Sequence, residues 1–490
     1  MEERLVFGYG ARRTDTQVPA SAGRGVPDRA PAVVEQAVAL EPRRTRETND
    51  WGYLGLLAFT AVLYMRPQDQ LPGLSTIPFA EITAIIGLSA MLFGRIQRGL
   101  SLTRVTPELI AVGLFGFVML LTAPFSVWPG GSVQAFTDVF VKIFLIYLLM
   151  VNTLTTPERV HKFMTIVVLA SGYLSTRAMF DYVRGVNLIE NGRVQGAIGG
   201  MFKNPNDMAL NMVAVLPLCV LVGLRAKTKF GTLLCLFAGL TMIGAIIASQ
   251  SRGGFVGLAI MVLILGLQLA RRKPAAVGAG VLVLLMALPF APSSYWERMA
   301  SITDSSKDAH GSREARRILL GEAWATFLRF PLHGVGAQQF ANYNPPERVE
   351  TWRETHNVVL QVAAELGILG LAVFGFLLWR AFTAGRVTRR LLRQGAGTSP
   401  PAWQVALGKR PEPPLISPVQ AEYVDAHAGA MTAALIGWFV CALFASVAYS
   451  WTFYYLLALA TAPHAILMQE LREKKAARLA QPAKLAEART

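Results

Sequence analysis

Five residues of this 490-residue chain are candidates for chemistry: three arginines, one lysine and one histidine. They lie in polar breaks between apolar runs. Arginine binds phosphate through a planar bidentate fork, so several cations together could hold a diphosphate. Histidine accepts a proton near neutral pH. The pattern predicts a site that binds a phosphate-like anion and moves one proton. The candidates are Arg193, Lys203, Arg252, Arg313 and His356.

Each candidate lies in or near a short motif that contains glycine or asparagine. Glycines beside Arg193 and Arg252 would let the backbone approach a bulky ligand closely. The asparagines can instead cap helices, and Arg252 can simply mark a membrane boundary. The supporting candidates are Asn204, Asn206, Asn357 and Glu365. The motifs are Arg193-Val194-Gln195-Gly196, Asn204-Pro205-Asn206, Ser251-Arg252-Gly253, Gly311-Ser312-Arg313, Gly334-Val335-Gly336, His356-Asn357 and Glu365-Leu366-Gly367.

The elements that must position these residues are apolar. The chain is 53% hydrophobic and only 16% charged, yet it has a net charge of +16. Soluble domains carry about 25% charged residues, and nucleic-acid binders are basic and rich in charge. The composition therefore indicates a multipass membrane protein. All three cysteines lie in apolar runs, which argues against a disulfide framework or a cysteine-based metal site.

Twelve apolar segments are long enough to suggest an all-α polytopic membrane protein with about twelve transmembrane helices, because a span takes about 20 residues. The predicted spans are 51–65, 76–93, 107–125, 132–152, 162–183, 206–224, 230–249, 253–270, 274–292, 357–379, 429–449 and 451–468.

Basic residues distinguish the two sides of this predicted bundle. With the N-terminus inside and Lys162 counted with the connection before it, 18 Lys and Arg residues fall in the inner connections 94–106, 153–161, 225–229, 271–273 and 380–428. Five fall in the short outer connections 66–75, 126–131, 184–205 and 250–252. Positive residues collect on the cytoplasmic side, so we predict that both termini are cytoplasmic. The motifs then share the outer face, which favours a single site.

The remaining segments complete the domain organisation. Within the loop 293–356, residues 312–330 predict an amphipathic helix along the outer membrane surface, with Leu320, Trp324, Phe327 and Leu328 on one face. The predicted parts are a disordered cytoplasmic tail at 1–50, spans 1 to 9 at 51–292, a large periplasmic loop at 293–356, span 10 at 357–379, a flexible, basic, proline-rich cytoplasmic loop at 380–428, spans 11 and 12 at 429–468, and a cytoplasmic tail at 469–490.

Charged residues inside spans are candidates for function because burying a charge there is costly. Glu365 has no local partner, so we expect it to face a polar cavity or a basic group. Glu81 and Glu108 lie near span ends and are expected to reach toward the membrane surface. Two pairs spaced i,i+4 are expected to neutralise each other, namely Asp138 with Lys142 and Arg177 with Asp181.

At these motifs the chain resembles the O-antigen ligase and polymerase superfamily. Its members share Arg-x-x-Gly followed by Asn-Pro-Asn, then Ser-Arg-Gly, then His-Asn at the start of a late span. The resemblance extends to the large outer loop and covers roughly residues 51–470, leaving out 1–50 and 394–428. Arg66-Pro67-Gln68 is similar to members associated with exopolysaccharide or exosortase clusters.

The resemblance implies transfer of a glycan from undecaprenyl diphosphate to an acceptor hydroxyl, without metal or cofactor, at the periplasmic face of the bacterial inner membrane. Arg193 and Arg252 would bind the diphosphate with help from Lys203 or Arg313, and His356 would orient or deprotonate the acceptor. Direct displacement would invert the anomeric centre. The implied partners are the lipid-linked glycan, an acceptor glycan or lipid, membrane lipids and other polysaccharide assembly proteins, with no nucleic acid.

The acceptor stays open, because the motifs describe the shared donor site. We favour a polysaccharide polymerase. The alternatives are an O-antigen ligase acting on lipid A-core, a protein O-oligosaccharyltransferase, and a lipid or sugar transporter. A transporter would favour a polar site in mid-membrane, between broken helices.

Overall fold

The computed structural model describes residues 51–70, 73–74, 76–189, 192–196, 202–270, 274–275, 277–278, 280, 282, 293–300, 312–395 and 416–487. The chain divides into the units Met1–Thr48 and Asn49–Thr490, and the first lies outside this part. So do the predicted tail at 1–50, most of the span at 274–292 and residues 396–415 of the predicted inner loop.

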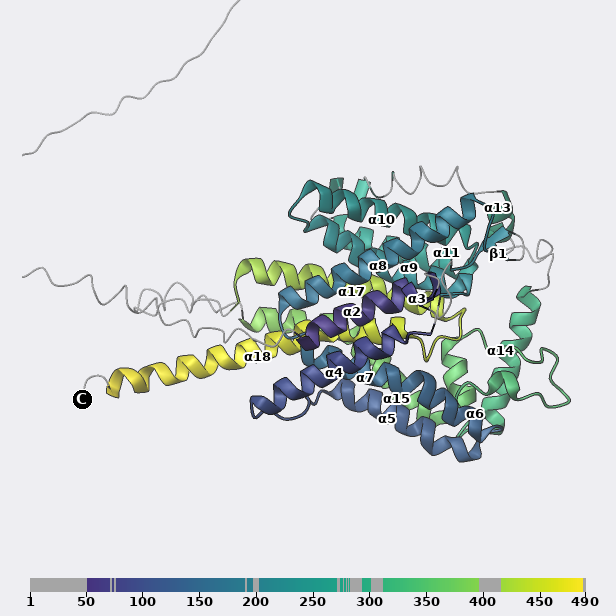
Figure 1. Cartoon of the computed structure of the whole chain (residues 1–490), viewed down its shortest axis with the longest axis horizontal. Coiled ribbons are helices and arrows are strands. Elements are labelled where there is room, and N and C mark those ends of the chain that lie inside the picture. The colour runs from purple at the N-terminus through teal and green to yellow at the C-terminus, as the bar shows by residue number, and fades with distance from the viewer. Residues whose placement is uncertain are drawn as a thin grey trace, which may run out of the picture. The chain divides into compact units, whose positions relative to one another are not determined.

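The second unit is a bundle of helices, which confirms the predicted all-α membrane fold (Figure 1). Its first part comprises α2 (Trp51–Met65), α3 (Pro67–Gln70), α4 (Phe79–Gln97), α5 (Pro107–Thr122), η1 (Ala123–Phe125), α6 (Pro129–Gln134), η2 (Ala135–Phe140), α7 (Val141–Thr153) and α8 (Pro157–Val183). Then follow β1 (Leu188–Ile189), β2 (Arg193–Val194), α9 (Pro205–Leu224), α10 (Lys229–Ala248), α11 (Arg252–Ala270), α13 (Ser293–Ala300), α14 (Ser312–Arg329), η6 (Phe340–Asn342), α15 (Val358–Gly395), α17 (Pro418–Ala442) and α18 (Trp451–Glu487).

Ten helices of the described part are long and apolar enough to cross a membrane, and they correspond to ten of the twelve predicted spans. The predicted span at 51–65 is the helix α2, whose 15 residues fall short of the usual length. It packs closely on α4, where a Cβ added to Gly55 would lie 2.4 Å from the Cα of Gly87.

Several long helices begin with a capping side chain followed by proline. Thr106 and Thr156 accept the backbone N–H of the third residue after them, at 3.1 and 3.2 Å. Proline suits the next position because its missing N–H would have no partner there. Ser417 caps α17 in the same way, accepting from Gln420 at 3.2 Å.

The predicted loop at 380–428 is therefore wrong at both ends. The Ser417-Pro418 start places α17 eleven residues before the predicted span, and α15 continues to Gly395 rather than ending at 379. Residues 380–395 are rich in Arg, Leu and Ala, which favour helix outside the membrane as well. The turn before α18 spans 443–450 instead of lying near 450.

The charged residues of the spans pair across helices as well as along them. The pair of Arg177 with Asp181 is confirmed at 3.4 Å. Lys142 instead binds Glu81 of α4 at 3.1 Å, because α4 packs against α7, so the predicted pairing of Lys142 with Asp138 was wrong.

Glu108 also differs from its predicted position at the membrane surface. It is buried, and its Oε1 accepts a hydrogen bond from Nε of Arg380 on α15 at 2.7 Å. A buried carboxylate of this kind needs the guanidinium beside it to offset the loss of hydration.

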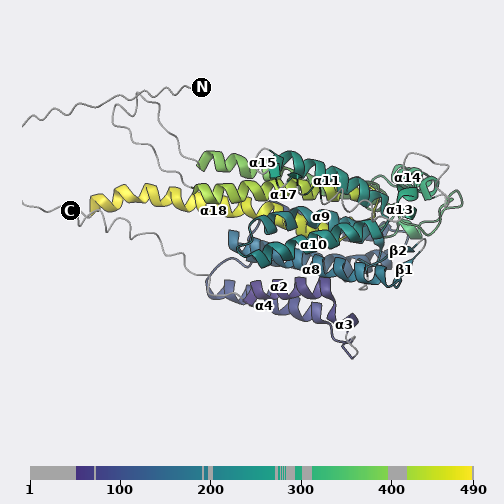
Figure 2. The same cartoon turned by 90° about the horizontal axis from the view of Figure 1, so that it is seen from above.

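The elements that carry the motifs meet at one end of the bundle. Figure 2 shows β1, β2, α13 and α14 together at this end, which we call the site end, and the C-terminal end of α18 at the other. The connections 249–251, 330–357 and 443–450 and the described residues of 184–204 lie at the site end, since each connection joins helix ends there. Candidates far apart in sequence are thus brought into one region.

Candidate active site

Arg193 ties three motifs of the site end together. It pairs with Ile189 in the two-stranded hairpin and is buried. Its Nε donates to the carbonyl of Ser249 at 2.9 Å, and its Nη2 donates to Oδ1 of Asn206 at 2.9 Å. Hydrogen bonds from a charged donor are the strong ones. The guanidinium therefore fixes the end of α10 beside the start of α9, next to the turn that leads into Arg252.

In the segment before α9, side chains and glycines make contacts with the backbone of the same segment. Asn204 caps α9 and accepts from the N–H of Asn206 at 2.9 Å, so its side chain has the structural role considered for the asparagines. A Cβ on Gly196 would lie 2.1 Å from the carbonyl oxygen of Phe202, so this glycine closes the loop. Lys203 is exposed at the surface of the site end.

Arg252 is half-buried at the first position of α11, directly after a tight turn. Gln250 adopts a left-handed backbone in this turn, with φ of 49°. Oγ of Ser251 accepts from the N–H of Gly254 at 3.1 Å and so caps the helix.

The glycines after Arg252 meet protein rather than open space. A Cβ on Gly253 would lie 3.0 Å from the Cβ of Phe444, and one on Gly254 would lie 2.9 Å from the Cβ of Ala209. Their role is to let α11 pack against α9 and the end of α17, not to admit a ligand as the sequence suggested.

His356 lies at the entrance to α15 in a constrained position. Its backbone is left-handed, with φ of 50°. Its N–H donates to Oγ of Ser446 at 2.9 Å, and the hydroxyl of Thr355 lies 3.0 Å from the same Oγ. The connection between α17 and α18 therefore fixes the backbone that carries the imidazole.

Asn357 proves to be a helix cap that also joins two connections. Its Oδ1 accepts from the N–H groups of Val359 and Leu360 at 3.0 Å, and its Nδ2 donates to the carbonyl of Leu443 at 3.2 Å. The adjacent Phe444 packs on Gly253. Residues 443–446 therefore touch both the start of α11 and the start of α15.

The two clusters are also linked electrostatically. Glu354, two residues before His356, lies close enough to Asp207 of α9 to interact with its carboxyl group. The structure thus brings the Arg193, Asn206 and Arg252 cluster and the His356 cluster to one end of the bundle.

The surroundings of His356 favour its neutral form. Burial, together with the smaller effect of the nearby cations Arg316 and Arg353, lowers its pKa to about 4. The imidazole is consequently unprotonated at neutral pH, as a proton acceptor must be. An anion bound between these cations would weaken their effect and raise the pKa toward a more useful value.

The sequence missed Arg316 and Arg353 as parts of the site. Arg313 lies in the first turn of α14, and its side chain is outside the described part. Arg316 follows it by three residues on the same helix, and this spacing could have drawn attention to it. Arg353 precedes His356 by three residues in a loop, where spacing predicts no shared face.

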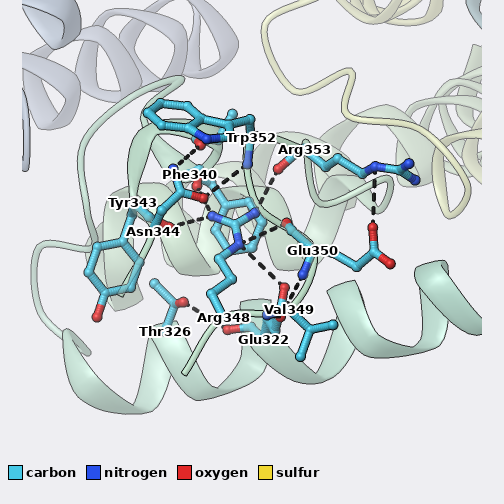
Figure 3. Close-up of polar contacts among 11 residues, drawn as sticks. Glu322, Thr326, Phe340, Tyr343, Asn344, Arg348, Val349, Glu350, Trp352 and Arg353 are labelled. Carbon is cyan, nitrogen blue, oxygen red and sulfur yellow. Dashed lines mark hydrogen bonds and ion pairs between the residues drawn. The ribbon is translucent and has the colours of Figure 1, made fainter. Parts of the chain in front are cut away.

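A buried arginine organises the loop that leads to His356 (Figure 3). Arg348 donates to the backbone carbonyls of Phe340, Tyr343, Glu350 and Arg353, the last at 2.8 Å. Its guanidinium also lies 4.1 Å from the ring centroid of Phe340. One side chain thereby gathers four points of the chain between 340 and 353.

Glu322 of α14 completes this cluster from the helix side. It pairs with Nε of Arg348 at 3.3 Å, and its other oxygen accepts from the N–H of Val349 at 2.6 Å and of Glu350 at 3.2 Å. We call Arg348 and Glu322 the loop clasp. The helix prediction for 312–330 is confirmed, although Trp324 and Leu328 face outward while Leu319 and Ala323 are buried.

Glu365 is buried among partners that are not basic. Its Oε2 accepts from the N–H of Gln338 at 2.9 Å and from the hydroxyl of Tyr449 at 2.9 Å. Its backbone carbonyl accepts from the N–H of Gly336 at 2.8 Å. The residue fastens the large loop to α15, which differs from the cavity or basic partner expected.

The motifs Gly334-Val335-Gly336 and Glu365-Leu366-Gly367 form the junction between the large loop and α15. Gly367 has φ of 63° and kinks α15. Around the kink, Ile368 N–H donates to the carbonyl of Pro331 at 2.7 Å, and Val335 N–H donates to that of Ala364 at 2.9 Å. A Cβ on Gly334 would lie 2.3 Å from the carbonyl carbon of Glu365, so the contact requires glycine.

Fold and site together define an all-α polytopic membrane protein with arginines and His356 gathered at one end of its bundle. Among the described residues, no group of three or more His, Cys, Asp or Glu could hold a metal ion. Residues 237–375, less than half of the chain, match the family model described as O-antigen ligase. The matched range runs from α10 to α15 and contains Arg252, the loop clasp and His356. No curated protein matches the chain.

Proposed function

We propose that the protein is a membrane glycosyltransferase that moves a glycan from an undecaprenyl-diphosphate donor to an acceptor hydroxyl, with the site end on the periplasmic face. The observation that carries this proposal is the position of His356 near the cations Arg316 and Arg353, at the same end as Arg252, within the matched family range. A base and cations are the two groups that such a transfer needs.

The proposed reaction divides the work between these groups. The acceptor oxygen attacks the anomeric carbon while its proton passes to the imidazole of His356. The bond from that carbon to the diphosphate oxygen breaks, and the leaving diphosphate takes the electron pair. Cations placed in advance stabilise the negative charge that develops there. A single displacement inverts the anomeric centre.

The arginines contribute in different ways in this proposal. Arg252 and Arg316 are the guanidinium groups that we assign to the diphosphate, with Lys203 at the exposed rim and Arg313 one turn from Arg316. Arg193 already donates to Ser249 and Asn206, so we assign it chiefly to holding the turn before Arg252. Such a turn keeps the cation in place before substrate binds.

For the acceptor we propose a new lipid-linked repeat unit, to which the growing polysaccharide chain is transferred, so that the protein is a polymerase. The support is the resemblance of Arg66-Pro67-Gln68 to exopolysaccharide-associated members. The family description, O-antigen ligase, favours lipid A-core as the second candidate.

The test is complementation of a deletion strain with His356→Asn. Asparagine tolerates the left-handed backbone at this position, so the loop keeps its shape while the imidazole is lost. We expect normal protein levels and transfer reduced at least about 100-fold, as for the loss of a general base. Glycans are analysed on lipid A, in the medium and on proteins.

The matched control is His333→Asn, a half-buried histidine of the same loop whose Nδ1 lies 2.7 Å from the carbonyl oxygen of Gly334. It should leave transfer near the wild-type level. Full activity of His356→Asn would refute the proposed base. Loss of secreted polymer in the deletion strain supports the polymerase, whereas loss of long chains on lipid A alone supports the ligase.

A further inference from the structure

Trp352 combines exposure with an unusual backbone. Its side chain projects from the loop, and the residue is 71% exposed. Its φ of 61° lies in the left-handed region, which bulky residues rarely occupy. Such strain persists only where the surroundings hold it, and it gathers at functional sites. An exposed tryptophan in this conformation therefore calls for a functional explanation.

The loop holds Trp352 from both sides. Its N–H donates to Oδ1 of Asn344 at 2.9 Å, and Asn344 in turn donates to the carbonyl of Ala341 at 2.9 Å. On the following residue, the carbonyl of Arg353 accepts from Arg348. Figure 3 shows the indole on the side of Arg348 that faces away from α14. The indole is thus presented on a fixed backbone.

The surroundings of Trp352 are polar. Most of its exposed neighbours in the loop are polar or charged, namely Glu347, Thr351, Arg353 and Glu354, and the apolar ones are Pro346 and Val349. Arg353 also pairs with Glu350 at 3.2 Å. The apolar side chains Trp324 and Leu328 lie instead on α14, where an anchor in lipid would be expected.

We propose that Trp352 is a carbohydrate-binding platform on which one sugar ring of the glycan stacks, four residues before His356. A pyranose ring has an apolar face that matches an indole and hydroxyls that match the charged groups beside it. This inference rests on the proposed function, because the glycan is the substrate of the transfer. Trp352 binds the transferred glycan while His356 takes the proton of the acceptor hydroxyl.

Three variants separate the indole from the fold of the loop. Trp352→Asn removes the ring and suits the left-handed backbone, and Trp352→Phe keeps an aromatic face. Trp324→Ala, on a tryptophan of α14 that is 51% exposed, is the matched control. The full-length protein is used in lipid nanodiscs.

The first measurement is binding of the oligosaccharide released by mild acid from the lipid-linked glycan of the deletion strain. Isothermal titration to full-length protein carrying His356→Asn avoids turnover. We expect Trp352→Asn to weaken binding about tenfold, equal to about 1.4 kcal/mol. Trp352→Phe should lose no more than about threefold, and Trp324→Ala should bind normally.

The second measurement is transfer from the lipid-linked glycan. Trp352→Asn should raise KM for the glycan about tenfold and change kcat less than about threefold. Unchanged binding and KM would overturn the platform, as would equal losses in Trp352→Asn and Trp352→Phe. A loss shared with Trp324→Ala would overturn it in favour of a lipid anchor. If the wild-type protein shows no transfer but still binds the oligosaccharide through Trp352, the proposed transferase function is contradicted and the platform is not.

Discussion

At the scale of single residues, His356 owes its properties to its neighbours. Burial and the cations Arg316 and Arg353 keep the imidazole neutral, with a pKa of about 4. Its left-handed backbone is held by Ser446. A base with so low a pKa is weak, so its strength in the proposed reaction depends on the anionic substrate that offsets those cations.

This dependence predicts how activity changes with pH. A lowered pKa means that His356 gains its proton only as the pH falls toward 4, so the acid limb of kcat/KM, which reports the free enzyme, should lie near that value. The limb of kcat reports the complex and should lie at higher pH, because bound diphosphate favours the protonated form. Both profiles are measured with the lipid-linked donor.

The control is Arg353→Gln, which removes one cation beside His356 and should move the limb of kcat/KM to higher pH. The shift should be modest, because burial is the larger cause of the lowered pKa. If the acid limb of kcat lies at lower pH than that of kcat/KM, the proposal that bound diphosphate raises the pKa of His356 is contradicted.

At the scale of elements, the loop clasp holds an irregular segment in a defined conformation. Residues 340–353 contain only the short η6 as regular structure. Arg348 and Glu322 instead supply hydrogen bonds to backbone groups that no helix or strand satisfies. The segment can therefore present Trp352 and Arg353 in defined positions.

Arg348→Ala should destabilise this loop by about 3 kcal/mol or more, because it removes the guanidinium that pairs with the Glu322 carboxylate and leaves several backbone carbonyls without a donor. We expect faster proteolysis within 340–353 while circular dichroism still shows the helical bundle. Arg348→Lys should recover only part of the protection, since a lysine cannot reach as many acceptors.

The comparison variant is Glu350→Gln, which weakens the pairing of Glu350 with Arg353, a side chain that is 56% exposed. Surface pairs of this kind are worth about 1 kcal/mol or less. Equal protease sensitivity in the two variants would show that the clasp does not hold the loop.

The sequence predicted the elements and motifs better than the contacts between them. Apolar length revealed most spans, and the motifs pointed to Arg193, Arg252 and His356, which meet at one end. Pairs between distant helices, such as Lys142 with Glu81, depend on packing that no local spacing encodes. Gly253 and Gly254 were assigned to a ligand for the same reason, since their packing partners are distant in sequence.

At the scale of the whole molecule, the connections at the site end depend on one another. Residues 443–446 contact the start of α11 through Phe444 and the start of α15 through Ser446. Arg193 holds the ends of α9 and α10. The proposed donor and acceptor groups therefore share one framework.

The proposed topology predicts which residues reagents can reach. Thr351→Cys at the site end should react with a membrane-impermeant maleimide in cells whose outer membrane is permeable. Arg386→Cys, exposed near the other end of α15, should react only after lysis. The three native cysteines are buried, so background labelling should be low. The reverse pattern would invert the assignment of the two faces.

The kink at Gly367 has a consequence for how the protein is made. The carbonyls of Ala364 and Glu365 and the N–H of Ile368 find their partners in residues 331–336, across the break in α15. A helix in lipid must satisfy its backbone within the protein. In the proposed topology, the tenth predicted span therefore reaches its final form only after the preceding loop has been exported and has folded back onto it.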